Sequence, residues 1–142
     1  MPGIVIDWRR ELDAGERMAE VRRVMVVDDS VTTATQMRRM IDAMDGYRVV
    51  GHARNGAEAL KLHATLQPDI VCMDINMPVM DGLQAVRALV RRDSGVKVIM
   101  VSSLGGVAER AAEALRLGAR EVLAKPFDSD QMLAAFNRLE DS

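Results

Sequence analysis

The 142-residue sequence has one cysteine, Cys72, so the chain cannot form an internal disulfide bond. Aromatic residues make up only 3% of it, which leaves few rings against which a flavin could stack. No apolar run approaches the roughly 18 residues needed to span a bilayer, and the first residues, "MPGIVIDWRREL", carry charge too early for a signal peptide. We therefore expect a cytoplasmic protein with no membrane partner.

The chain also lacks an excess of either charge. Its 19 Lys and Arg and 21 Asp and Glu give a formal net charge of -2, which predicts no general attraction to nucleic acid. Hydrophobic residues make up 49% and charged residues 28%, as in ordinary globular proteins. A single domain of this length buries roughly 68–70% of the surface of its unfolded chain, so a core needs no additional crosslinks.

Five short apolar runs alternate with segments that have helical spacing. The runs are "VMVV" at 24–27, "YRVVGHA" at 47–53, "DIVCM" at 69–73, "KVIMV" at 97–101 and "REVLA" at 120–124. Four of them are largely apolar without alternation, which is typical of parallel strands covered on both faces. The segments after each run favour helices, with Gly118 as a helix stop and Asp128 as a helix cap. Strand followed by helix, five times, predicts an α/β domain with a parallel sheet and helices on both faces.

Residues 1–21 precede this pattern as an N-terminal extension, so the domain itself is predicted to span 22–142. The extension is either a short docked helix, which Trp8 would anchor, or a mobile tail. Met18 is a second candidate for the natural first residue. The sequence contains no internal repeat, low-complexity tract or linker.

Polar residues follow four of the five predicted strands, at the edge where open parallel sheets bind their ligands. The strand ends carry Asp28, Asp29 and Ser30, then Asp74, then Ser102 and Ser103, and finally Lys125. Each of these residues alone has a simpler explanation as a helix cap, a turn former or a loop residue. Their joint occurrence at four strand ends instead favours one polar site.

Three converging carboxylates, those of Asp28, Asp29 and Asp74, would raise one another's pKa or require a cation. Mg²⁺ fits best, because it prefers oxygen ligands and the sequence has no His or Cys cluster for zinc. Lys125 would offer a point charge, and Ser102 a hydroxyl, to a phosphate group bound there. One carboxylate could then attack phosphorus and form an aspartyl phosphate.

Four stretches, "VMVVDDS", "DINMPVMDG", "VIMVSS" and "AKPF", resemble the receiver domain of two-component response regulators of the chemotaxis CheY-like type. The resemblance extends over residues 22–140, and the ordered set is specific where each stretch alone is not. It implies a flavodoxin-like, five-stranded parallel sheet in the order 2-1-3-4-5. It also implies a sensor histidine kinase or a phosphotransfer domain as the phosphoryl donor.

The resemblance implies a role for each residue of the site. Asp74 matches the phosphoacceptor, Lys125 the phosphate-binding lysine and Ser102 the switch hydroxyl that moves toward the phosphoryl group. The implied Mg²⁺ ligands are Asp28, Asp29, Asp74 and the backbone carbonyl of Asn76. Asp29 would bind the ion directly, and Asp28 would act through water or as a second acid. Phosphorylation would alter the surface of the fourth helix, the fifth strand and the last helix, to which a downstream protein effector would bind.

The sequence departs from many receivers at Val122, where an aromatic residue commonly stands three positions before the lysine. We therefore expect signalling to rely on Ser102 and on residues 104–106, whose two glycines permit positive φ. Asn76 and Leu104 would flank the path of the hydrolytic water, which predicts an intermediate lifetime for the phosphoryl group.

The stretch "VSSLGGVAERAAEALRLGAREVLAKP" is similar to receivers of chemotaxis methylesterases, but no esterase domain follows it. We expect a stand-alone receiver. A phosphate sink for a shared kinase, and a receiver detached from a longer regulator, remain open alternatives. Direct transcriptional control is not expected, because the sequence contains no DNA-binding module.

An enzyme of another class, a Mg²⁺-dependent aspartyl-nucleophile phosphatase, is the main competing hypothesis. Such enzymes carry Asp-x-Asp at the first strand, whereas Asp28 and Asp29 are adjacent and "DIN" follows the third strand. A phosphoacceptor is therefore expected rather than a turnover enzyme.

The remaining polar side chains fit structural roles. His52 and His63 have no acidic partner in a suitable motif, so we expect them at the surface or partly packed. Arg87, Arg91 and Arg92 punctuate one predicted helix, which is typical of a solvated face.

Overall fold

The computed structural model describes residues 21–75, 77, 80–103 and 107–140, and the side chains of 107–109 are not described. Its strands are β1 (Arg22–Val27), β2 (Tyr47–Ala53), β3 (Ile70–Asp74), β4 (Lys97–Ser102) and β5 (Glu121–Ala124). Its helices are α3 (Val31–Asp42), α4 (Gly56–Leu66), α5 (Gly82–Arg92), α6 (Val107–Leu117) and α7 (Ser129–Glu140). The predicted alternation of strand and helix is therefore confirmed.

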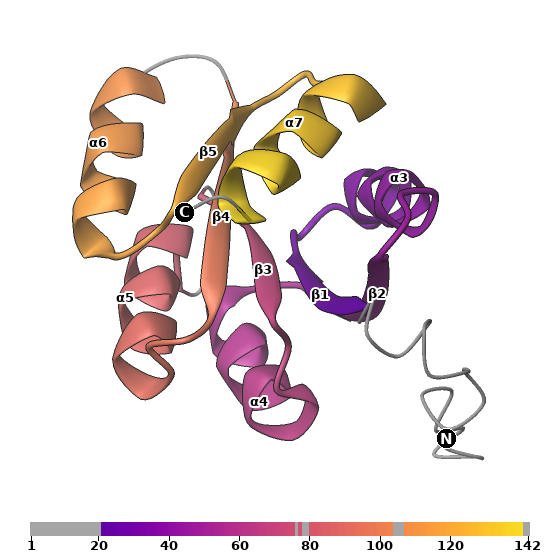
Figure 1. The fold of residues 1–142 in the computed structure, drawn as a ribbon. Coiled ribbons are helices and arrows are strands. Elements are labelled where there is room, and N and C mark those ends of the chain that lie inside the picture. The colour runs from indigo at the N-terminus through magenta and orange to yellow at the C-terminus, as the bar shows by residue number, and fades with distance from the viewer. Residues whose placement is uncertain (1–20, 76, 78–79, 104–106, 141–142) are drawn as a thin grey trace.

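The five strands form one parallel sheet in the order β2-β1-β3-β4-β5, as predicted. Helices α3 and α7 pack on one face of the sheet, and α4, α5 and α6 pack on the other (Figure 1). This is a flavodoxin-like arrangement. Its active edge is expected where the carboxyl ends of β1, β3 and β4 lie side by side.

Each face of the sheet has its own apolar layer, because successive strand residues point to opposite faces. Met25 and Met73 pack toward α4, α5 and α6, whereas Val26 and Cys72 pack toward α3 and α7. Both layers contain fully buried side chains, including Leu89 in the first. The continuous apolar runs in the sequence follow from this arrangement.

The predicted helix boundaries at Gly118 and Asp128 are also confirmed. Gly118 adopts φ +120 after α6, a conformation that an L side chain rarely takes, and its N–H lies 3.2 Å from the carbonyl of Leu115. Asp128 and Gln131 bond reciprocally before α7, each backbone N–H reaching the other's side-chain oxygen at 2.8 Å. Local hydrogen bonds of this kind make the ends of both helices readable from sequence.

The N-terminal extension predicted for 1–21 lies outside the described residues except for Val21. The choice between a docked helix and a tail therefore remains a prediction. Among the described residues, no helix is long and apolar enough to cross a membrane.

Candidate functional site

The polar residues predicted for the site emerge from neighbouring strands. Asp28 follows β1, Asp74 is the last residue of β3, Ser102 is the last residue of β4 and Lys125 follows β5. Backbone bonds extend the sheet past these ends: Lys125 N lies 2.7 Å from the carbonyl of Ser102, and Asp28 N lies 3.0 Å from that of Ala53. The side chains are therefore presented by a fixed sheet edge and not by free loops.

Three of these side chains form an acidic cluster. One carboxylate oxygen from each of Asp28, Asp29 and Asp74 lies within 4.8 Å of the others. Asp28 is 1% exposed and Asp74 6% exposed, while Asp29 is open to solvent. Carboxylates this close repel one another unless a cation or a proton intervenes. Oxygen donors alone, with no described histidine or cysteine in the cluster, match the ligand preference of Mg²⁺.

Lys125 supplies a positive charge to this cluster. Its Nζ lies 3.1 Å from Oδ2 of Asp28 and 3.7 Å from Oδ2 of Asp74. The other oxygen of Asp28 accepts a hydrogen bond from the N–H of Ser30 at 2.8 Å, so this carboxylate is held at both ends. When the three acids are ionised, the cluster with Lys125 carries two negative charges, which a divalent cation would balance.

Ser102 is 1% exposed, and its hydroxyl donates to the carbonyl of Ser103 at 3.2 Å. The hydroxyl is thus bonded to the backbone of the next residue, just beyond the end of β4. Val122, on the neighbouring strand β5, is half-buried in the core and leaves this position without an aromatic ring. Asn76 and the loop 104–106 lie outside the described residues, so the roles expected of them remain predictions.

Gly82 has a closer relation to the site than the sequence indicated. A Cβ on Gly82 would lie 2.2 Å from the carbonyl oxygen of Asp74 and 2.8 Å from Cα of Ile75. Its N–H donates to the carbonyl of Ile75 at 2.9 Å, and the preceding Asp81 caps α5 by accepting from Gln84 N at 2.9 Å. Helix α5 therefore begins directly against the backbone of Asp74. The pair Asp81-Gly82 before a helical segment was the available sequence signal.

Comparison with known proteins identifies the family of this chain. Residues 24–137 match the response regulator receiver domain family. The chain belongs to this family.

Relatives of this receiver domain include whole proteins of similar length. The chemotaxis protein CheY of Thermotoga maritima is 36% identical over 118 residues, a match that covers 83% of this chain and 97% of that protein. A protein-glutamate methylesterase/protein-glutamine glutaminase of Methanococcoides burtonii is 39% identical over 120 residues, covering 82% of this chain but 33% of that enzyme. The predicted likeness to methylesterase receivers is thus confined to about a third of the length of this enzyme.

Solved structures agree with the receiver fold. The CheX-CheY-BeF3-Mg+2 complex from Borrelia burgdorferi matches with a TM-score of 0.78 and 28% identity, covering 90% of this chain and 94% of that chain. The order 2-1-3-4-5 inferred from the resemblance is that of this molecule, which shares its fold with this relative.

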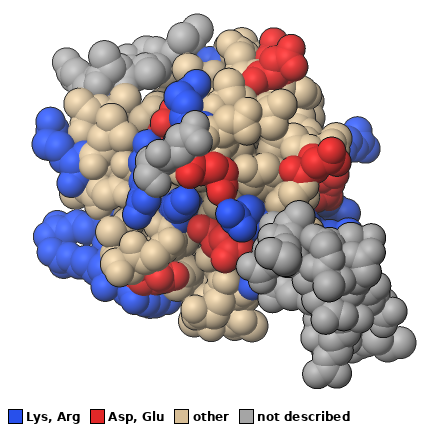
Figure 2. Space-filling view, in the orientation of Figure 1, with Lys and Arg blue, Asp and Glu red and all other residues tan. Residues whose placement is uncertain are grey.

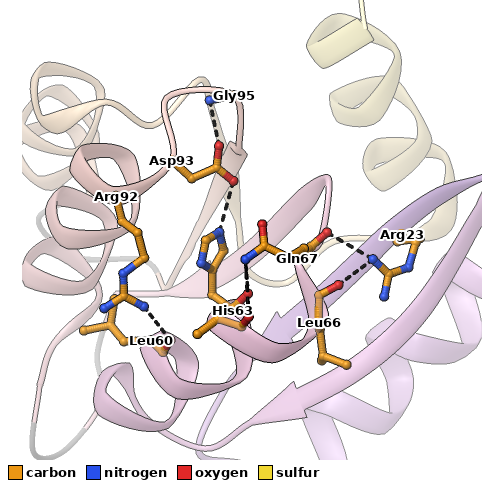
Figure 3. A network of polar contacts seen from close by, with 9 residues as sticks. Arg23, Leu60, His63, Leu66, Gln67, Arg92, Asp93 and Gly95 are labelled. Atoms are coloured by element: carbon orange, nitrogen blue, oxygen red, sulfur yellow. Dashed lines mark hydrogen bonds and ion pairs between the residues drawn. The ribbon is translucent and has the colours of Figure 1, made fainter.

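The two histidines of this receiver domain differ in their surroundings. His52 is half-buried, and its Nε2 lies 2.8 Å from the carbonyl oxygen of Asp28, which tethers β2 to the acidic cluster. The expectation that His63 lies at the surface or is only partly packed was wrong. His63 is 1% exposed, and its Nε2 lies 3.1 Å from Oδ2 of Asp93 at the end of α5 (Figure 3). This partner stands 30 positions further along the chain, beyond any local motif.

Proposed function

We propose that this receiver domain is a phosphorylation-controlled signalling switch in which Asp74 accepts a phosphoryl group from a phosphohistidine. The donor would be a sensor histidine kinase or a phosphotransfer domain. The observation that carries this proposal is the cluster of Asp28, Asp29 and Asp74, whose carboxylate oxygens lie within 4.8 Å of one another beside Lys125.

The chemistry requires little more than positioning. An oxygen of Asp74 attacks phosphorus, an oxygen–phosphorus bond forms as the phosphorus–nitrogen bond to the donor imidazole breaks, and the imidazole leaves with the electron pair. The buried position of Asp74 at the end of β3 restricts the directions from which a donor can approach. Lys125, 3.7 Å from Oδ2 of Asp74, is close enough to bind the phosphoryl oxygens that gather there.

The donor set fits Mg²⁺, with Asp28 and Asp29 as the acids on the metal side, Asp74 beside them and the backbone carbonyl of Asn76 as a further proposed ligand. A bound Mg²⁺ would neutralise charge on the phosphoryl oxygens. Support comes from the Borrelia burgdorferi relative, whose CheY is described in complex with BeF3 and Mg+2.

The signal would leave the site through Ser102. Its hydroxyl donates to the carbonyl of the adjacent Ser103 at 3.2 Å, and a phosphoryl oxygen would offer it a stronger, charged acceptor. We propose that this movement and the loop 104–106 alter the surface formed by α6, β5 and α7. A protein effector would recognise that surface.

Two arrangements of the same chemistry fit this chain. A stand-alone receiver would resemble the Thermotoga maritima CheY, of which the match covers 97%. The methylesterase relatives show the second arrangement, a receiver that occupies part of a larger protein. A phosphate sink for a shared kinase would use the same site without an effector.

The direct test is intact-protein mass spectrometry after incubation with Mg²⁺ and acetyl phosphate. We expect a single phosphoryl adduct that is labile to hydroxylamine, absent from Asp74→Asn and present in Asp45→Asn. Asp45 is a suitable control because it is an exposed aspartate in the turn after α3. An adduct that persists in Asp74→Asn would reject Asp74 as the acceptor. No adduct and no Mg²⁺ binding in the unsubstituted protein would make the domain a phosphorylation-independent interaction module.

A further inference from the structure

Helix α5 differs from the other helices in its charge. The segment Gly82–Arg92 contains three arginines and no aspartate or glutamate, although the whole chain has a formal net charge of -2. The segments of α3, α4, α6 and α7 each combine acidic with basic residues. In Figure 2, Lys and Arg side chains gather at the lower left of the view, where Figure 1 draws α5.

Helix stability explains only part of this pattern. Arg91 and Arg92 lie in the last turn, where a positive charge is favourable at the helix C-terminus. Arg92 is also engaged structurally, since its Nη1 donates to the carbonyl of Leu60 at 2.7 Å and ties α5 to α4 (Figure 3). Neither explanation applies to Arg87, which lies a full turn earlier.

Arg87 and Arg91 are exposed, and within the described part of the chain no ion pair or hydrogen bond engages either guanidinium. They stand four positions apart, so they project from the same side of the helix, one turn from each other. Gln84 extends this row toward the N-terminus, and the small, half-buried Ala88 lies within it. We call these four residues, Gln84, Arg87, Ala88 and Arg91, the arginine face.

The arginine face is held on a rigid support. On the other side of α5, Ala85, Val86 and Leu89 are fully buried in the core. The start of the helix is capped by Asp81, and Gly82 packs on the backbone of Asp74. A ligand on this face would therefore meet two arginines whose backbone positions are fixed by the helix, so that only their side chains lose freedom on binding.

We propose that the arginine face docks a partner protein through a helix that presents carboxylates one turn apart. Each guanidinium can bind one carboxylate through two parallel hydrogen bonds, so a pair at i and i+4 matches the spacing of Arg87 and Arg91. Ala88 between them lets the partner backbone approach closely. The partner would then lie along α5, whose first residue, Gly82, packs on the backbone of Asp74.

The number of available charges favours a protein partner over other polyanions. Two unengaged arginines suit two carboxylates. Duplex DNA is bound through about 6–10 phosphate contacts, and anionic membranes through clusters of about 4–8 basic residues. The net charge of -2 would weaken both of those interactions further.

The experiment is an NMR titration of the ¹⁵N-labelled full chain, without phosphorylation, at low salt. The probe is an alanine-rich helical peptide with glutamates at i and i+4, and a peptide with glutamines at those positions is the comparison. We expect shift changes confined to α5 with the glutamate peptide and none with the glutamine peptide. A double-stranded oligonucleotide and vesicles of phosphatidylcholine with phosphatidylserine serve as the competing ligands.

Two double variants change the net charge equally. Arg87→Glu/Arg91→Glu should weaken binding of the glutamate peptide by about tenfold or more, because each attraction becomes a repulsion. Arg39→Glu/Arg48→Glu changes exposed arginines of α3 and β2. Its affinity for the glutamate peptide should stay within about twofold of that of the unsubstituted chain. Circular dichroism would verify that both variants keep their fold.

Equal losses in both double variants would mean that only net charge matters and would overturn the proposal. Binding of the oligonucleotide or the vesicles at α5, without binding of the peptide, would also overturn it. Because the titration uses the unphosphorylated chain, its result does not depend on the function proposed for Asp74.

Discussion

Lys125 is paired more closely with Asp28 than with Asp74. Its Nζ lies 3.1 Å from Oδ2 of the buried Asp28 and 3.7 Å from Oδ2 of Asp74. The lysine thus compensates one acid on the metal side of the cluster while remaining within reach of the proposed phosphoacceptor. A phosphoryl group on Asp74 would compete with Asp28 for this ammonium.

Lys125→Met should separate metal binding from phosphoryl transfer. We expect formation of the acetyl phosphate adduct to fall more than about tenfold, because the phosphoryl oxygens lose their ammonium partner. Mg²⁺ affinity should be retained or rise, since the substitution removes a positive charge that competes with the ion for the carboxylates. Mass spectrometry and calorimetric Mg²⁺ titration measure the two quantities.

Lys97→Met is the matched control, because Lys97 opens β4 and bonds the carbonyl of Leu139 at 3.3 Å instead of the acidic cluster. Loss of Mg²⁺ binding in Lys125→Met would show that the lysine is needed to hold the carboxylates in place, contrary to this view.

Gly82→Ala should disturb both stability and the site. The new Cβ would meet the carbonyl oxygen of Asp74 at 2.2 Å, so backbone must move, and we expect a loss of about 1–3 kcal/mol in unfolding free energy. Urea unfolding measures the loss, and adduct formation should slow in parallel. Gly95→Ala is the control, because the atom nearest to its new Cβ would be Oδ1 of Asp93 at 3.4 Å. Its unfolding free energy should stay within about 0.5 kcal/mol of that of the unsubstituted protein. Equal effects of the two substitutions would contradict the close approach.

His63 and Asp93 should be energetically coupled. A double-mutant cycle with His63→Leu and Asp93→Ala should give an interaction of about 1 kcal/mol, because a buried imidazole N–H is left without its acceptor when Asp93 is truncated. The cycle also separates this bond from the one between Oδ1 of Asp93 and Gly95 N. His63→Leu combined with Asp45→Ala should be additive within about 0.5 kcal/mol. An additive result for Asp93 as well would mean that the pair contributes nothing to stability.

Cys72 should titrate only after unfolding. Burial raises the pKa of its thiol to about 12, above the value of 9.0 expected for an exposed thiol. Between these values the unfolded chain releases a proton that the folded chain retains. The contribution of the thiol to the unfolding free energy is therefore fully present below about pH 9 and is lost as the pH rises. The decline should be steeper than in Cys72→Ala by up to about 1.4 kcal/mol per pH unit.

Urea unfolding at several alkaline pH values provides this comparison. Independently, Ellman's reagent should modify Cys72 near pH 8 only in the presence of denaturant. Rapid modification of the native protein would disprove burial of the thiol.

Much of the fold could be predicted because its signals are local. The apolar run at 24–27 contributes to both layers, with Met25 on one face and Val26 on the other. Because both faces are buried, the run is continuously apolar, which is typical of a central parallel strand. The caps at Gly118 and Asp128 involve neighbours in sequence. Asp28, Asp74 and Lys125 could be placed at one edge because parallel strands end on the same side of a sheet.

The remaining features depend on pairs that are distant in sequence. His63 and Asp93 meet only because α4 and α5 lie side by side, and neither residue has a local signal for the other. The contact of Gly82 with the carbonyl of Asp74 depends on how the chain turns between β3 and α5. The absence of a nearby acidic residue in the sequence therefore did not predict the environment of His63.

The amino-acid sequence by itself determined the number and kind of elements, the two-layered core and the acidic edge, because hydrophobic periodicity and strand ends are local properties of the chain. Tertiary structure alone decided that Lys125 sits nearer Asp28 than Asp74, and that Arg87 is left unengaged among the described residues. Such pairings depend on small differences in the distances between side chains that lie at the ends of β1, β3 and β5 or on neighbouring helices. Those distances are set only when the sheet order and the packing of the helices bring the elements together.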